Sequence, residues 1–347
     1  MQGVIRGIGY AVLFLAVMAC GGIALQHVDP FREVPMLREK WDHWQKHKDD
    51  YDTVFIGTSR TYRGISPALF DEVTAAAGMP TRSFNYGIDA MLPPEDAYVA
   101  EYVLRNPPKN LKWVFIELGV FVDDFEDRNP DSVRSRHWHD WRRTSLCVEA
   151  TLWPKQKSEK LKTWFKPRKD KPWPADTAWT HLRLFGVRAL NLGRGATAMN
   201  EWMAGKGPDP RQLGPWGNGF NPYPKSNVLK GDSLVAYEKG LAARQKDPAR
   251  PAPLKAQQQE SFDDVVTYAR RAGAKPIAII APTTGPLRLR PAGQSKVPLI
   301  DACDVQAFPE FFTPDVRIDH AHLNLRGAEL FTRYLAGQFV ELARQSP

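Results

Sequence analysis

The sequence predicts an α/β protein with a central parallel sheet, preceded by one membrane-spanning helix. Short, almost wholly apolar segments alternate with helical segments in the order strand, helix, strand, helix, strand. Such apolar strands are expected where both faces of a sheet are covered. A segment of twenty uncharged residues, 7–26, lies near the start of the chain.

The uncharged segment is long enough to cross a bilayer, because a helix of that length reaches about 30 Å. Arg6 precedes it, and basic charge ahead of a first apolar segment favours an anchor with its N-terminus inside the cell. We take residues 1–28 as this anchor. Two alternatives stay open: a cleaved signal peptide, and a lipoprotein carrying its lipid on Cys20. All three export the rest of the chain.

The remaining elements follow in order. A charged segment with two tryptophans, residues 29–50, predicts a juxtamembrane helix. Apolar segments that end at glycines predict strands over residues 51–56, 82–86 and 113–118. Helices are expected between them over residues 71–77 and 94–106. The alternation resumes late in the chain, with a helix over 262–271, a strand over 276–280 and a last helix over 325–343.

We therefore expect one α/β domain in two pieces, residues 51–124 and 258–347. The part between them, 125–257, lacks sustained periodicity and is too long for a loop, which predicts an insertion or lid of short helices and turns. Within it, residues 153–174 hold eight cationic side chains and three tryptophans. Two interpretations stay open. The segment is either a surface that binds phospholipid headgroups or an anionic glycan, or it is a solvated basic loop whose tryptophans are buried.

Composition limits the classes of binding partner that we expect for this chain. The net charge of +8 suits an anionic membrane surface or polymer, or solubility alone. We expect no nucleic acid partner, because no recognised binding motif accompanies the charge. Cys147 and Cys303 are the two cysteines of the exported part, and they form either one disulfide or two buried thiols.

Three residues carry the candidate chemistry. Ser59 lies just after the first apolar strand, while Asp319 and His322 lie three residues apart before the last helix. In a Ser-His-Asp arrangement the histidine accepts the serine proton, and the aspartate orients the imidazole and stabilises its charged form. Either end alone is ordinary, since a turn serine and a surface histidine are common. Together they predict a serine nucleophile.

Further candidates lie where the strands end. Ligands of open parallel sheets bind beyond the carboxyl ends of the strands, and Ser59, Gly87 and Gly119 each follow one. The N–H of Ser59, at the start of a helix or turn, is expected to face a developing oxyanion. Glu117 is an acid inside an apolar strand, so it needs a partner, and Arg60 is the one we expect.

We expect no metal and no cofactor. The segment 137–140 contains two histidines and an aspartate, but no further cluster completes a site, so a surface segment is expected there. An acidic run over residues 123–127 reads as a solvated loop near the mouth of the site.

The segments 57–59, 85–90 and 319–324 resemble the first, second and last sequence blocks of the SGNH/GDSL hydrolase family. The resemblance covers residues 51–124 and 258–345. It implies a flavodoxin-like three-layer α/β/α fold, with Ser59 as nucleophile, His322 as general base and Asp319 as its orienting acid. It also implies that the Gly87 N–H joins the Ser59 N–H in the oxyanion hole.

The sequence departs from the family in the third block. Members usually supply an oxyanion-hole asparagine after the third strand, but residues 117–121 contain none. Another donor would then be needed, with Arg60 and the Gly119 N–H as candidates. Losing one such donor typically lowers the rate on the order of a hundredfold.

We expect an exported protein of a bacterial inner membrane, with one span and the globular domain on the periplasmic or extracellular side. The layout resembles proteins of teichoic acid D-alanylation and polysaccharide O-acetylation, which implies a serine acyl hydrolase or acyltransferase acting on O-acetyl esters of an envelope polysaccharide. It also implies a membrane-bound O-acyltransferase as partner. Two alternatives are a catalytically silent polysaccharide-binding or scaffold module, and a secreted esterase or lipase.

Overall fold

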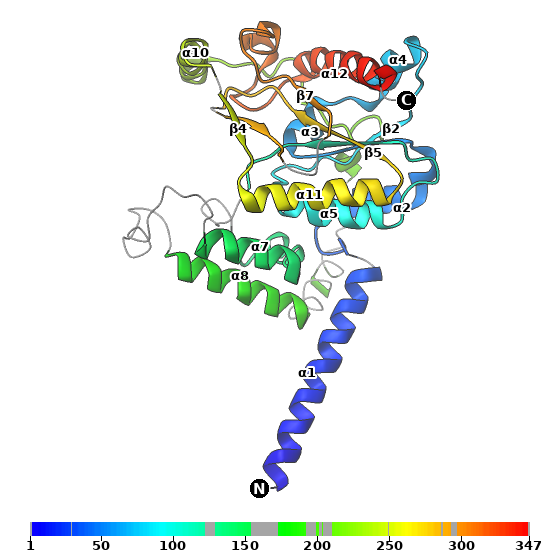
Figure 1. Cartoon of the computed structure of the whole chain (residues 1–347), viewed down its shortest axis with the longest axis vertical. Helices are drawn as coiled ribbons and strands as arrows, with labels where there is room; N and C mark the ends of the chain where they lie inside the picture. Colours follow the sequence, from blue (N-terminus) through cyan, green and yellow to red (C-terminus); the bar gives the residue numbers. More distant parts are fainter. Residues whose placement is uncertain are drawn as a thin grey trace. The chain divides into compact units, whose positions relative to one another are not determined.

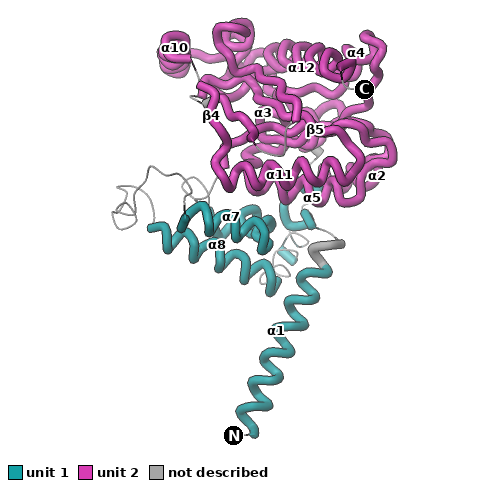
Figure 2. The backbone as a smooth tube through the Cα atoms, viewed as in Figure 1, with its two compact units in different colours: residues 1–38, 122–209 teal, residues 39–121, 210–347 magenta. Residues whose placement is uncertain are grey.

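The structure is a computed structural model of the chain (Figure 1). It describes residues 2–28, 30–121, 129–153, 173–191, 199–200, 203, 210–248, 250–285, 287–292 and 297–345. The chain forms two compact units, coloured separately in Figure 2: residues 1–38 with 122–209, and residues 39–121 with 210–347. We call them unit 1 and unit 2. Their bounds differ from those predicted, because residues 210–257, expected in the insertion, group with unit 2.

Unit 2 is built on a five-stranded parallel sheet with the strand order β2-β1-β3-β5-β7. Its strands are β1 (Thr53–Ile56), β2 (Ser83–Asn85), β3 (Trp113–Glu117), β5 (Lys275–Ile280) and β7 (Leu299–Asp301). The predicted parallel sheet is confirmed, and the first four strands lie where the apolar segments placed them. The sequence did not predict β7.

The register aligns the carboxyl ends of three strands. Phe55 of β1 pairs with Asn85, the last residue of β2, and Ile56 pairs with Ile116 of β3. Since all these strands run in one direction, the segments that follow β1, β2 and β3 leave the sheet at the same edge.

Helices flank this sheet in two pairs. Helix α4 (Pro67–Ala76) packs beside α12 (Leu325–Gln345), and α5 (Glu95–Arg105) packs beside α11 (Ala256–Arg271). In Figure 1 the two pairs lie on opposite faces of the sheet. Ser66 caps α4 by accepting from the Leu69 N–H, and Pro67 suits the first turn because its missing N–H would have no partner there.

Phenylalanines tie one helix pair to the sheet. The rings of Phe55 on β1 and Phe115 on β3 lie 4.7 Å apart, and Phe70 of α4 and Phe339 of α12 pack on them at 5.0 to 5.5 Å. All four are fully buried. Burying each such side chain contributes roughly 2–3 kcal/mol, so this cluster strongly stabilises the packing of α4 and α12 on β1 and β3.

Three further elements of unit 2, two strands and one helix, come from segments with no clear pattern. Strand β4 (Arg250–Pro253) pairs in parallel with β6 (Leu287–Arg290) in a small second sheet. Helix α10 (Gly231–Lys246) lies before β4 in the chain.

Near the N-terminus, α2 (Pro35–His47) and a 3-10 turn (Lys48–Asp50) form the helix predicted over residues 29–50.

Unit 1 contains α1 (Gln2–Val28), α6 (Val133–His137), α7 (Trp141–Leu152) and α8 (Pro174–Ala189). Helix α1 is long and apolar enough to cross a membrane over Gln2–Ala24, where its mean hydropathy is 2.0, and little of it is buried. This agrees with a signal anchor or a single span. Helices α7 and α8 pack side by side (Figure 1).

Candidate active site

Ser59 is held at the end of β1 by a tight turn into a short helix, α3 (Ser59–Gly64). Thr58 caps this helix: its Oγ1 accepts from the Arg60 N–H at 3.2 Å. Gly57 is required before it, because a Cβ at that position would overlap Thr61 Oγ1 and the Glu117 carboxylate. Ser59 is therefore the first residue of a helix that packs closely against the end of the sheet.

The acid and the imidazole are placed by their own loop. Asp319 Oδ1 accepts from the backbone N–H groups of Ala321 at 2.6 Å and His322 at 2.7 Å. The Ile318 N–H donates to the His322 carbonyl at 3.2 Å and closes the turn. The three-residue spacing thus lets one carboxylate order the backbone and still present its second oxygen to the imidazole.

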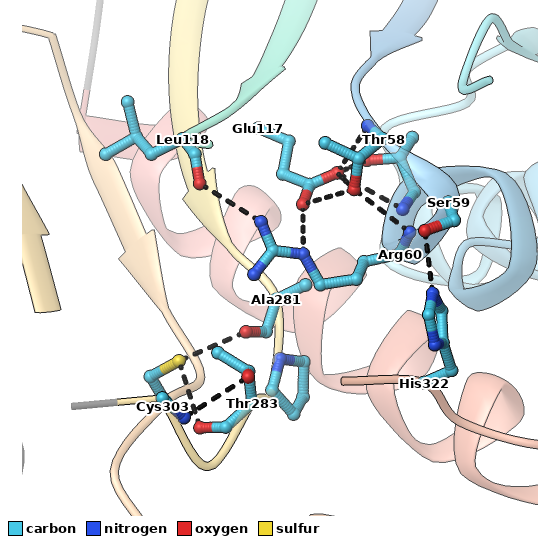
Figure 3. A network of polar contacts seen from close by, with 12 residues as sticks. Thr58, Ser59, Arg60, Glu117, Leu118, Ala281, Thr283, Cys303 and His322 are labelled. Atoms are coloured by element: carbon cyan, nitrogen blue, oxygen red, sulfur yellow. Dashed lines mark hydrogen bonds and ion pairs between the residues drawn. The ribbon is translucent and has the colours of Figure 1, made fainter. Parts of the chain in front are cut away.

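The structure brings Ser59, His322 and Asp319 together. Ser59 Oγ lies 2.7 Å from His322 Nε2, a contact visible in Figure 3. His322 Nδ1 lies 2.8 Å from Asp319 Oδ2. Because a carboxylate accepts, the imidazole proton belongs on Nδ1, which leaves the Nε2 lone pair for the Ser59 hydroxyl. All three residues are partly exposed.

The Asp319 carboxyl is a strong acid in this site. Partial burial alone would raise its pKa, but the hydrogen bonds from the His322 ring and the Ala321 N–H outweigh it and lower the pKa from 3.8 to about 2. Asp319 therefore stays ionised at neutral pH and can orient and stabilise an imidazolium without taking its proton.

Arg317 supports this loop from inside the core. Its side chain is fully buried and donates to the carbonyls of Asp319 at 3.2 Å, His320 at 2.7 Å and Pro282 at 3.1 Å. Burial lowers the pKa of the guanidinium. Sequence reasoning missed this residue, which lies two positions before Asp319.

Glu117 connects β3 to α3, and Arg60, the partner expected for its carboxylate, is present. Arg60 Nε lies 2.6 Å from Glu117 Oε1, and the Glu117 side chain is fully buried. Its Oε2 accepts from the Thr58 N–H at 2.8 Å (Figure 3) and from Thr61 Oγ1 at 2.7 Å. Every residue in this network lies within two positions of Ser59 or at the end of β3, so Glu117 fixes α3 against the sheet.

Gly87 corrects an expectation. Its N–H, predicted to face the oxyanion, donates instead to Asn85 Oδ1 at 2.8 Å. The amide of Asn85 also donates to the carbonyls of Thr61 and Ile65, each at 2.8 Å, so it is held in this orientation. A Cβ at Gly87 would overlap the backbone of Tyr62, which explains a glycine here by close approach to α3.

The remaining expected donors differ in availability. None of the described residues accepts a hydrogen bond from the Ser59 N–H, so this group is open to a ligand. The Arg60 guanidinium is paired with Glu117 and also reaches the Leu118 carbonyl at 3.4 Å. Gly119 is buried, and its carbonyl accepts from the Gln258 side chain at 2.5 Å.

Lys40, on α2, is a second residue that the sequence did not reveal. Its buried ammonium donates to the carbonyls of Asn85 at 2.9 Å, Gly87 at 2.6 Å and Gly219 at 2.8 Å, and it lies 4.2 Å from the centre of the Tyr62 ring. Burial lowers the pKa of Lys40 well below its usual value. It links α2 to the loop after β2, and no local pattern distinguishes it from other lysines.

The other sequence candidates add no metal site. His137 and His139 were expected on the surface but are buried in unit 1, where His139 Nε2 contacts His181 Nδ1 at 2.9 Å. Among the described residues, no three metal-binding side chains come together. The basic segment of residues 154–172 and the acidic run 123–127 lie outside the described residues.

Cys147 and Cys303 are free thiols, and both are buried. Burial raises the pKa of the Cys303 thiol to about 11. Of the two alternatives that the sequence left open, buried thiols are confirmed.

The fold and site together define an α/β protein with a hydrogen-bonded serine, histidine and aspartate at the carboxyl edge of a parallel sheet. No family model matches this sequence, and a comparison with characterised proteins found no similar one.

Proposed function

We propose that this chain is a serine-dependent acyl hydrolase or acyltransferase of the SGNH/GDSL type. The observation that carries the proposal is the hydrogen-bonded series from Ser59 Oγ to His322 Nε2 at 2.7 Å and from His322 Nδ1 to Asp319 Oδ2 at 2.8 Å. These lengths suit direct proton transfer between the serine and the imidazole.

We also propose a flavodoxin-like three-layer arrangement for unit 2. Numbered in chain order within the main sheet, the strands run 2-1-3-4-5, which is the flavodoxin-like order. Helix pairs on the two faces of the sheet support it. In such folds a ligand binds outside the carboxyl ends of the strands, where Ser59 lies.

In the proposed reaction, Ser59 Oγ attacks the carbonyl carbon of an ester while its proton moves to His322 Nε2. The C–O bond of the tetrahedral intermediate then breaks, and the leaving alcohol takes the proton from His322. This gives an acyl-serine. A water molecule or a sugar hydroxyl attacks the acyl carbon next and passes its proton to His322. The bond between Ser59 Oγ and the acyl carbon then breaks, and Ser59 Oγ takes the proton back from His322. Asp319 stabilises the imidazolium in both halves.

The proposed substrates are O-acetyl esters of an envelope or secreted polysaccharide. Helix α1 supports a protein anchored at a membrane, and we place it in a bacterial inner membrane with unit 2 on the outer side. A membrane-bound O-acyltransferase would supply the acyl group. Hydrolysis and transfer share every step up to the acyl-serine, so the acceptor alone separates them.

The second candidate is a silent binding or scaffold module, and one observation favours it. The Gly87 N–H is occupied by Asn85, and residues 117–121 contain no asparagine, so two donors expected of an oxyanion hole are not available here. Each lost oxyanion donor lowers the rate about 10²–10³-fold.

One experiment separates the two candidates. Full-length protein in detergent is assayed for p-nitrophenyl acetate turnover and for labelling by a fluorophosphonate, in wild type, Ser59→Ala and Ser145→Ala. The last removes a serine hydroxyl of α7 outside the site. Turnover and labelling that vanish only in Ser59→Ala support the enzyme. Wild-type protein that neither turns over nor labels supports the binding module.

A further inference from the structure

Two side chains that the proton transfers do not use flank Ser59 and His322. Arg63 lies one helical turn after Ser59 on α3, and residues four apart on a helix share a face. Tyr223 lies beside the imidazole, with its ring centre 5.9 Å from that of His322 and the planes nearly perpendicular. The Arg63 guanidinium lies 4.8 Å from the centre of the Tyr223 ring. The two therefore meet next to the reacting pair.

A carboxylate completes this group. Asp89 pairs with Arg63 through two contacts, Nη2 to Oδ2 at 2.5 Å and Nε to Oδ1 at 3.2 Å. The neighbouring Ala90 has a φ of +55°, a conformation that L residues rarely adopt, so the turn that presents Asp89 is a specific one. Arg63 Nη1 also donates to the Asn221 carbonyl at 3.0 Å, which fixes the guanidinium plane.

The Arg63, Asp89 and Tyr223 side chains are held in place by these contacts but remain partly exposed to solvent. The side chains of Arg63 and Asp89 are 18% and 33% exposed, and Tyr223 is partly exposed. Since Asp89 neutralises Arg63, the surface carries no net charge and suits a neutral ligand better than an anion. It offers carboxylate acceptors, guanidinium donors and an aromatic ring within one small area.

We propose that Tyr223, Arg63 and Asp89 form a subsite for a neutral pyranose ring of the acylated glycan. This inference rests on the proposed function. Adjacent ring hydroxyls each donate and accept, which matches an Arg–Asp pair, while the C–H face of a sugar packs on a tyrosine ring. A sugar held there has an ester substituent next to Ser59 Oγ, and such positioning is a main source of rate enhancement.

The test compares two esters on full-length protein: partially O-acetylated xylotetraose and p-nitrophenyl acetate. In Asp89→Asn and Tyr223→Ala, kcat/KM for the glycan ester should fall about tenfold or more relative to that for the small ester. The first change weakens the acceptor for the sugar hydroxyls, and the second removes the ring on which the sugar packs. The matched control is Glu101→Gln, which alters a similar Arg–carboxylate–Tyr cluster on α5, where Arg105 pairs with Glu101 over Tyr102.

A binding measurement keeps the subsite separate from the chemistry. Saturation-transfer NMR of the same glycan with the Ser59→Ala protein should show contacts that disappear when Tyr223→Ala is added. If this holds while wild type turns over neither ester, the subsite stands and the proposed function fails. The subsite is overturned by two results together. Both variants lower kcat/KM for the two esters equally, and the NMR contacts of the glycan either persist in Tyr223→Ala or never occur.

A different observation concerns unit 1. Four tryptophans at α7 and α8 are strongly exposed: Trp141 at 64%, Trp153 at 60%, Trp173 at 45% and Trp179 at 67%. One pair of helices thus carries four large exposed aromatic side chains, which are candidates for contact with a partner. Tryptophan is enriched at the level of lipid headgroups, where its ring is apolar and its N–H is wet.

The contact between α8 and α1 indicates which partner this surface meets. The carboxyl end of α8 touches α1 at Gly22, where an added Cβ would lie 3.0 Å from Asn191 Cβ and 3.1 Å from the Ala189 carbonyl. The membrane-length segment of α1 ends two residues later, at Ala24. With Gln2–Ala24 as a membrane span, as proposed above, the end of α8 lies at the depth where that span leaves the hydrocarbon.

We infer that the α7–α8 pair docks on the bilayer surface through its tryptophans, beside the span formed by α1. The proposal is independent of the chemistry at Ser59. Side chains that enter the headgroup region would hold unit 1 flat against the lipid and so limit how far it can tilt.

The test uses the full chain with Cys20→Ser, since the other two cysteines are buried. Trp179→Cys carries an environment-sensitive fluorophore, and the protein is reconstituted in phosphatidylcholine–phosphatidylglycerol nanodiscs. Nitroxide lipids labelled near the headgroup should quench it, while aqueous iodide should not. The control is Trp216→Cys, a tryptophan of unit 2 that is 55% exposed. Iodide quenching at position 179 as strong as at 216, without lipid quenching, overturns the proposal.

Discussion

Glu117 at the end of β3 and Arg60 on α3 form an ion pair of 2.6 Å, one residue away from Ser59. The carboxylate is fully buried, and the guanidinium is 18% exposed. A buried charge is tolerated only when it is paired and its remaining lone pairs are satisfied, and here Thr58 and Thr61 satisfy them. The pair therefore holds α3, and with it Ser59, against the end of β3.

Glu117→Ala should loosen α3 and the end of β3. The change leaves Arg60 without its partner and the N–H groups of Thr58 and Thr61 without acceptors, which together cost about 2–4 kcal/mol. Hydrogen exchange at the amides of α3 and β3 measures this locally. The amides should exchange on the order of 30- to 1,000-fold faster than in wild type.

Glu101→Gln is the matched control, because it removes a partly exposed ion pair with Arg105 on α5. Exposed pairs contribute about 0–1 kcal/mol, so protection should hardly change. Equal loss of protection in both variants would show that Glu117 has no special role in holding α3.

Much of the sheet was predictable because its strands are buried on both faces. The segments that became β1, β3 and β5 are mostly apolar, with polar residues only at their ends, so no periodicity had to be resolved. In contrast, β7 is three residues long, and β4 contains two prolines within four residues. Pairing of such segments depends on their neighbours and leaves little trace in the sequence.

The contacts of the site also fall into those that the local sequence predicts and those that it does not. Asp319 and His322 act within one turn, so their spacing alone predicted the contact. Tyr223 reaches His322 from a segment predicted to be an insertion, and Lys40 reaches Gly219 across 179 residues. Such contacts depend on tertiary structure that no local pattern records.

Arg317→Lys should free the loop that carries Asp319 and His322. Lysine keeps the charge but replaces a planar group with five donors by one with three, so it cannot hold the same set of carbonyls. The N–H groups of Ala321 and His322, bonded to Asp319 in wild type, should exchange faster by about tenfold or more. Hydrogen exchange read by NMR measures both.

The comparison for this variant is Arg326→Lys, since Arg326 is 63% exposed and pairs with Asp315. Its exchange should match wild type. An Arg317→Lys protein in which the two loop amides keep their protection would refute the role given to the guanidinium.

Lys40→Met should disturb the loop after β2. Methionine fills a similar volume without donors, so the carbonyls of Asn85, Gly87 and Gly219 lose a shared partner. Removing a buried charge offsets part of that loss, which leaves a net destabilisation of about 1–3 kcal/mol. The Ile88 N–H, which donates to the Gly57 carbonyl, reports it by faster hydrogen exchange.

Lys112→Met serves as the control because Lys112 is 64% exposed and pairs with Asp52. If both lysine variants give the same exchange at Ile88, then Lys40 does not organise the loop.

Asp319 should make the protein lose stability in acid. Its pKa is lowered from 3.8 to about 2 in the folded protein, so the folded state binds its proton more weakly than the unfolded state does. The resulting stabilisation is complete above about pH 4 and is lost as the pH falls towards 2. The side chain is 42% exposed, so solvent screening reduces the size of the effect, but its direction is fixed.

Asp319→Asn removes this titration, and urea unfolding of the full chain in detergent at pH 5 and pH 2.5 measures the difference. The fall in the midpoint between the two pH values should be larger in wild type than in Asp319→Asn. Asp232→Asn, on the exposed first turn of α10, controls for the loss of one carboxylate. An Asp319→Asn midpoint that falls as far as that of wild type would mean that the hydrogen bonds of Asp319 do not stabilise its charged form.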